Sequence, residues 1–115
     1  MMRCLNRRPR SEWPTAVFCA NDNIAIGALR VAQEIALSVP DELSIIGVDD
    51  SVSGQKTSPP LTTMRQDLHE LGCVAAAQLI SGLESRDYGG VINLKLPMQL
   101  VERASCSRPG QTRRK

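Results

Sequence analysis

The stretch Ala16-Val17-Phe18-Cys19-Ala20-Asn21-Asp22 begins the part of the chain that decides the fold. Its apolar run stops at Asn21, and an amphipathic helical pattern follows as far as about Leu37. A second apolar run, residues 43–48, ends at the acidic pair Asp49-Asp50. A short buried strand, a helix and a second short buried strand are typical of a parallel βαβ unit. The sequence therefore predicts an α/β fold with a Rossmann-like parallel sheet.

Polar side chains follow both predicted strands where each strand ends, Asn21 after the first and Asp49 after the second. Open parallel sheets bind ligands outside the carboxyl ends of their strands. An amide and a carboxylate together donate and accept hydrogen bonds, which suits the hydroxyl groups of sugars and ribosides. Both positions have a structural alternative, because Asn21 or Asp22 can cap the following helix, and Asp49 and Asp50 can both serve the turn.

Charge is distributed unevenly along the chain. Residues 11–107 hold 6 of the 14 basic residues and all 12 acidic ones, a net charge of −6, and the other 8 basic residues lie at the two ends. An acidic folded part is a poor surface for nucleic-acid phosphates. We interpret residues 1–13 as a disordered leader, 14–105 as the folded segment and 106–115 as a disordered basic tail. Weak contact of the basic ends with nucleic acid is the alternative.

The sequence contains no motif that predicts catalysis, a cofactor or a metal site. It lacks the motifs G-x-S-x-G and G-x-G-x-x-G, and Gln55 interrupts a near match to a phosphate loop at residues 54–57. The four cysteines are scattered and His69 is the single histidine, so no zinc site is expected. No apolar run has membrane-spanning length and no secretory signal is recognisable, which predicts a cytoplasmic protein without membrane contact.

Residues 51–105 continue the alternation of elements. Residues 51–58 predict one short turn of helix, and 61–65 predict a short strand or an extended crossover segment. A second long helix is predicted over 67–84, and strands are predicted over 91–96 and 98–103. Both predicted helices carry an apolar stripe. In the first helix the stripe is formed by Ile24, Ala28, Val31 and Ile35 and is widened by Ala25, Leu29, Ala32 and Ala36. In the second helix it is formed by Leu68, Leu71, Gly72, Ala75, Leu79 and Leu83.

A series of short motifs resembles the LacI/GalR family of bacterial transcriptional repressors. The motifs occur in the order and spacing of that family, between about Pro14 and Ser105. They are Pro14–Asp22, Ala25-x-Gly27-Ala28, Val39-Pro40, Ser44–Asp50, Pro59–Thr63 and Gln66. The resemblance covers the C-terminal part of the family's sensor region, which implies a partial periplasmic-binding-protein-like (type I) domain. The family's helix-turn-helix, its hinge helix and the first part of its sensor region have no counterpart in this sequence.

The resemblance also implies a small-molecule effector, a sugar or a related polyol or riboside, held between two lobes. Asn21, Asp49 and Gln66 match the effector-binding positions of the family. The helix over 67–84 would belong to the other lobe. Specific DNA binding in the family requires the helix-turn-helix, so none is expected of this chain. A homodimer is implied through a face that matches Ile26, Arg30, Val52, Lys56 and Thr57.

Two other functions remain open at this point. A fragment of a periplasmic-type sugar-binding protein would share the fold, although the lack of an export signal and the series of motifs argue against it. A small hydrolase using Asp49 and Asp50 is the remote alternative, because adjacent side chains on an extended chain point to opposite sides. Two residues depart from the family pattern: Val48 stands where an aromatic residue is common, and Ala36 replaces a glycine at the helix end.

Overall fold

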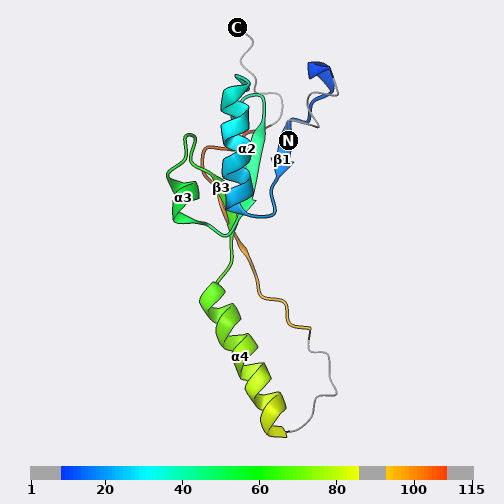
Figure 1. Cartoon of the computed structure of the whole chain (residues 1–115), viewed down its shortest axis with the longest axis vertical. Helices are drawn as coiled ribbons and strands as arrows, with labels where there is room; N and C mark the ends of the chain where they lie inside the picture. The colour runs from blue at the N-terminus through cyan, green and yellow to red at the C-terminus, as the bar shows by residue number, and fades with distance from the viewer. Residues whose placement is uncertain (1–8, 86–92, 109–115) are drawn as a thin grey trace. The chain divides into compact units, whose positions relative to one another are not determined.

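The computed structural model describes residues 9–85 and 93–108, which include a four-stranded sheet (Figure 1). Strands β1 (Ala16–Phe18), β2 (Ser44–Val48) and β3 (Thr62–Arg65) run parallel, and β4 (Gln99–Val101) pairs antiparallel with β3. The strand order is β1-β2-β3-β4. The predicted α/β fold with a parallel βαβ unit is therefore confirmed.

Helix α2 (Asp22–Glu34) packs against β2 and supplies much of the buried core (Figure 1). The buried apolar residues of this helix, Ala25, Ala28, Leu29 and Ala32, all belong to the expected apolar stripe. Ile24, at the edge of that stripe, is 54% exposed. Small side chains allow a helix backbone to approach a sheet closely, so the alanine row faces the strands. The core is formed by Cys19, Ala25, Ala28, Leu29, Ala32, Leu37, Leu43, Ile45 and Leu61.

Helix α2 ends in a left-handed residue that is not a glycine. Ala36 has a φ of 53°, and the next amide, Leu37 N–H, donates a hydrogen bond of 2.8 Å to Ala32 O. Helices commonly end in this way, but the left-handed position favours glycine because a Cβ atom is strained there. The helix end thus keeps its hydrogen bond although Ala36 replaces the glycine of the family pattern, and the alanine backbone is more strained there than a glycine backbone would be.

The chain divides into two units, which differ in burial. Unit 1 consists of residues 1–65 and 99–115 and contains the sheet, α2 and the short helix α3 (Val52–Gln55). Unit 2 consists of residues 66–98 and contains α4 (Leu68–Ser85), which confirms the second long helix. No residue of α4 is buried, and Leu68, Leu71, Leu79 and Leu83, which we call the α4 leucine face, are 45–65% exposed.

Of the two strands predicted near the C-terminal end, β4 confirms the one expected over 98–103. The prediction of a strand over 91–96 is wrong for residues 93–96, which have no regular structure, and residues 91–92 lie outside the described part. Alternation of apolar and polar residues produces a strand only where another strand is available for pairing. The described residues of unit 2 contain no such strand.

Described residues near both ends of the chain make polar contacts within unit 1. Arg10–Glu12 forms a short 3-10 helix, η1, and Arg10 Nη2 lies 2.9 Å from Glu42 Oε1. Near the other end, Ser107 N–H donates to Ser44 Oγ at 3.1 Å. Described residues on either side of 14–105 therefore make contacts with the folded part, and the boundaries at 14 and 105 stay predictions. No helix in the described ranges is long and apolar enough to cross a membrane.

Candidate functional site

Asn21 follows β1 and is the N-cap of α2. Its backbone is extended, and its Oδ1 accepts a hydrogen bond from Ile24 N–H at 2.9 Å. The capping interpretation of Asn21 is therefore confirmed, since this bond satisfies one of the amides that lack a partner within the helix. Capping uses only the side-chain oxygen, so the Nδ2 amide is the group that this half-buried residue can offer to a ligand.

Asp49 follows β2 at the same edge of the sheet and is exposed. Its φ of 114° and the φ of 55° at Asp50 place two consecutive residues in a region that L-amino acids rarely adopt. Its amide N–H donates to Met64 O at 2.8 Å, so hydrogen bonding to β3 continues to this residue. Such backbone strain persists only where surrounding contacts hold the chain in place.

Asp50 is the buried member of the acidic pair, with a side chain only 7% exposed. Its Oδ1 lies 2.5 Å from Arg103 Nη2, and its Oδ2 lies 2.6 Å from Arg65 Nη2. The hydrogen bond from Arg103, and after it the one from Arg65, holds the pKa of the Asp50 carboxyl below its usual value. The acid pair does not supply the cap of the following turn, because the N-cap of α3 is Ser51, whose Oγ accepts from Gly54 N–H at 3.1 Å.

A second buried carboxylate, Asp22, connects the start of α2 with the turn after β2. It is 1% exposed, its Oδ2 accepts from Ser51 N–H at 2.7 Å, and its Oδ1 accepts from Thr63 Oγ1 at 2.6 Å. The sequence suggested only a capping role for Asp22, and that role belongs to Asn21. The partners of Asp22 lie 29 and 41 residues away along the chain, so no local pattern indicates them.

Gln66, the third predicted effector residue, belongs to unit 2 and is half-buried. It lines a small pocket together with Asp67, Leu71 and residues 96–98 of the same unit. The structure therefore brings Asn21 and Asp49 to one edge of the sheet in unit 1 and describes Gln66 with the other unit.

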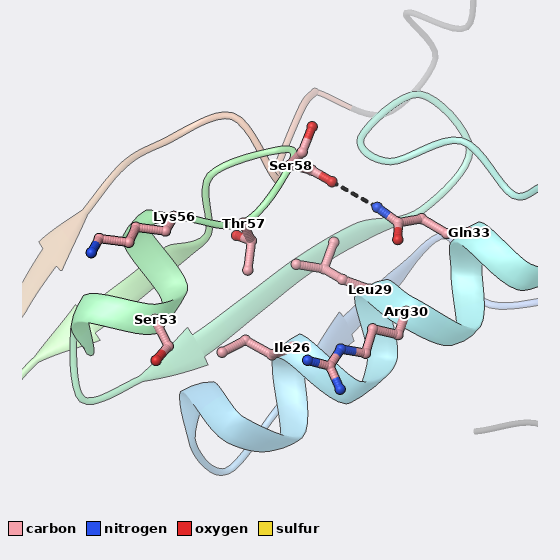
Figure 2. Close-up of a pocket in the computed structure, with 8 residues that line it drawn as sticks. All are labelled: Ile26, Leu29, Arg30, Gln33, Ser53, Lys56, Thr57 and Ser58. Atoms are coloured by element: carbon pink, nitrogen blue, oxygen red, sulfur yellow. Dashed lines mark hydrogen bonds between the residues drawn. The ribbon is translucent and has the colours of Figure 1, made fainter.

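A pocket of about 310 Å³ lies between α2 and the segment that contains α3 (Figure 2). Figure 2 shows Ile26 and Arg30 lining it from α2, and Lys56 and Thr57 lining it from the end of α3 and the residues after it. Val52 is 65% exposed on α3 and does not line this pocket. Four of the five residues predicted for the dimer face are thus gathered around one surface depression.

Within residues 9–85 and 93–108, no group of three or more His, Cys, Asp and Glu side chains is placed to hold a metal ion. His69 and Cys73 lie one turn apart on α4, with Nε2 and Sγ separated by 3.7 Å. Protein metal sites of the zinc type use three or four protein ligands, so this exposed pair does not constitute one.

Comparison with known proteins assigns the fold to a family. Residues 2–106 match the periplasmic binding protein-like domain. The lactose operon repressor of Rhizobium radiobacter is 38% identical over 96 residues, which cover 84% of this chain and 83% of that protein. The crystal structure of the Lac repressor dimer bound to operator and the anti-inducer ONPF matches with a TM-score of 0.77 and 35% identity, over 91% of this chain and 35% of that one. A LacI family regulator from Enterococcus faecium with bound ribose matches with a TM-score of 0.72 and 29% identity, over 92% of this chain and 37% of that one.

Other relatives are considerably longer than the matched segment. Two further curated repressors are covered over 27% and 26% of their length, so this chain spans about a quarter of each. The family match extends over nearly the whole chain, and the parallel sheet with polar residues at its carboxyl edge agrees with it. The chain belongs to the periplasmic binding protein-like family and represents part of the sensor domain of a LacI-family transcriptional regulator.

Proposed function

We propose that this chain contributes to the effector site of a LacI-family regulator, and that Asn21 and Asp49 bind hydroxyl groups of a sugar or a related polyol or riboside. The observation that carries the proposal is the position of both side chains after adjacent parallel strands, β1 and β2. Ligands of open parallel sheets bind at this edge. The ribose bound to the Enterococcus faecium regulator supports the chemical class of the ligand.

The chemistry of the two side chains is complementary. The Asp49 carboxylate accepts hydrogen bonds from hydroxyl groups, and the Nδ2 amide of Asn21 donates to a hydroxyl oxygen. A polyol presents donors and acceptors on neighbouring carbon atoms, so it can engage both residues at once. Gln66 is proposed as a third effector contact, and the match of its position to the family supports this assignment.

The proposal includes a homodimer through the surface around the α2–α3 pocket. Ile26 provides a half-buried apolar centre, and Arg30 and Lys56 provide charged groups around it. An apolar centre with a polar rim is the usual composition of a protein interface. The similar Lac repressor structure is a dimer, which supports a dimeric assembly. The assignment of Ile26, Arg30, Val52, Lys56 and Thr57 to this face rests on the resemblance to the family.

The chain is further proposed to act in the cytoplasm by ligand binding, without catalysis and without recognising an operator by itself. Its relatives are transcriptional repressors, and specific operator binding requires an element that enters a DNA groove. A sugar-binding transport protein of the same fold is the alternative. The repressor relatives and the series of family motifs favour the regulator.

A chimaera tests the effector proposal. In it, this chain replaces the matched segment of the Lac repressor, and the protein is titrated calorimetrically with lactose, arabinose and ribose. Asp49→Ala is expected to raise the dissociation constant of the sugar that binds roughly 10- to 150-fold, because a hydrogen bond to a charged group contributes roughly 1.5–3 kcal/mol.

Glu34→Ala is the matched control, since it removes an exposed carboxylate from α2 away from the strand ends. Its dissociation constant is expected to equal that of the unsubstituted chimaera. Equal dissociation constants for Asp49→Ala and Glu34→Ala would remove Asp49 from the effector site. Binding of none of the three sugars would contradict a sugar related to them as the effector, and the polyols and ribosides of the proposed class would be titrated next.

A further inference from the structure

Asp22 is buried beside the candidate effector residues, but no effector contact is proposed for it. A carboxylate that is 1% exposed is costly to bury unless its oxygens accept well-formed hydrogen bonds. Both oxygens do so, Oδ2 from Ser51 N–H at 2.7 Å and Oδ1 from Thr63 Oγ1 at 2.6 Å. Both oxygens of the buried Asp22 side chain are therefore used to hold Ser51 and Thr63 in place.

Both hydrogen bonds lead to the turn that follows Asp49. Ser51 is bound directly, and Asp50 N–H donates to Thr63 Oγ1 in a longer bond of 3.4 Å. The Thr63 hydroxyl thus connects the Asp50 amide to the Asp22 carboxylate. The Asp22 carboxylate thus holds two consecutive backbone amides, that of Ser51 directly and that of Asp50 through Thr63. Both amides lie in the turn immediately after Asp49, whose φ is positive.

Two glycines leave room for the Asp22 carboxylate. A Cβ atom at Gly47 would overlap Asp22 Oδ1, and a Cβ atom at Gly54 would lie 3.1 Å from Asp22 Oδ2. Strand β2 and helix α3 therefore both approach the carboxylate at positions that have no side chain. This packing restricts the position of the carboxylate in addition to its hydrogen bonds.

We infer that Asp22 is a positioning residue of the effector site, because its carboxylate holds the turn at Asp49–Ser51 in the conformation that presents Asp49 at the carboxyl end of β2. Asp22 directly follows Asn21, so a single residue fixes the start of α2 and the turn after β2 relative to each other. The inference rests on the proposed function for its effect on a ligand, but the conformation of the turn is measurable without one.

Amide hydrogen exchange of the nitrogen-15-labelled 115-residue chain, followed by NMR, tests this inference with no sugar present. Thr63→Val keeps the side-chain shape and removes the hydroxyl that links Asp50 to Asp22. The Asp50 amide is then expected to exchange about tenfold faster relative to the Ile45 amide of β2. In Asp22→Ala, the Asp50 and Ser51 amides are both expected to accelerate by at least that factor.

Thr62→Val is the matched control. Thr62 is the preceding residue of β3, is also buried, and accepts a hydrogen bond from Arg103 N–H at 2.9 Å instead of bonding to Asp22. Unchanged exchange at Asp50 in Thr63→Val, or equal acceleration in Thr62→Val, would overturn the inference. Thr63→Val decides the question if Asp22→Ala does not fold. The result is independent of the sugar titration, so each of the two proposals can fail separately.

Discussion

Units 1 and 2 each contain a long helix, but only the helix of unit 1 has a buried face. Helix α2 buries Ala25, Ala28, Leu29 and Ala32, whereas α4 buries none of its 18 residues in the described structure. Apolar periodicity predicted both helices equally well. The difference shows that periodicity determines where a helix forms, whereas its stabilisation depends on the residues available to cover it. Asn21, Asp22 and Asp49 all lie in the unit that has the core.

Equivalent leucine truncations in the two units are expected to have very different effects. Leu43→Ala in the core of unit 1, where Leu43 is 2% exposed, should lower the free energy of unfolding by about 2–5 kcal/mol. Leu79→Ala on the α4 leucine face should change it by less than about 0.5 kcal/mol. Urea denaturation followed by fluorescence of Trp13, which packs against the core, measures both. Similar losses for the two variants would show that α4 is part of the same cooperative unit.

Removal of one carboxylate from each unit is expected to give a smaller difference in unfolding free energy than the two leucine truncations. Asp50→Asn should lower the free energy of unfolding at pH 7 by roughly 1–3 kcal/mol, mostly through Arg103, because Arg65 is half exposed and its pairing is screened by solvent. Asp67 accepts from Glu70 N–H at 2.9 Å at the start of α4, and asparagine serves equally well there. Asp67→Asn should therefore leave urea denaturation unchanged, and a loss equal to that of Asp50→Asn would contradict the contrast.

The effect of Asp50→Asn is expected to depend on pH. The folded-state pKa of Asp50 lies below its ordinary value of 3.8, so its stabilisation is fully present above about pH 4 and is lost as the pH falls through the folded pKa. The urea midpoints of the unsubstituted chain and of Asp50→Asn should therefore differ at pH 7 and converge below about pH 4. Glu42 also has a lowered pKa, caused first by the Ser38 amide, so the difference between the two proteins is the quantity to compare.

Alanine-to-glycine substitutions should have opposite signs in the two helices. Ala36→Gly relieves a left-handed alanine at the end of α2 and should raise the free energy of unfolding by up to about 1 kcal/mol. Ala76→Gly within exposed α4 should lower the helix content, since glycine disfavours a helix by about 1 kcal/mol relative to alanine. Thermal unfolding followed by far-ultraviolet circular dichroism checks both. A lower midpoint for Ala36→Gly would show that the left-handed conformation is absent in solution.

The elements were predictable from sequence because their signals are local. The apolar runs before Asn21 and Asp49 predicted β1 and β2, and the helical period between them predicted α2. The exact buried face of α2 was not predictable, because Ile24 and Ala25 both fit an apolar stripe and only packing on the sheet selects Ala25.

The candidate site was predictable only in part, for a related reason. Asn21 and Asp49 stand at strand ends, which sequence indicates directly. The roles of Asp22 and Asp50 depend on partners contributed by β3 and by Arg103, far along the chain. A buried carboxylate and an exposed one have the same letter in the sequence, so only the fold distinguishes Asp49 from Asp50.

Hydrogen exchange measured by mass spectrometry on the 115-residue chain tests the contrast between the two units most directly. Peptides from α2, β2 and β3 are expected to remain protected up to the global free energy of unfolding, because their amides belong to the covered core. Peptides from α4 are expected to exchange at nearly unprotected rates, because α4 buries none of its residues and each leucine of the α4 leucine face is 45–65% exposed. Protection of α4 equal to that of β2 would contradict the account and would show that the helix is covered in solution.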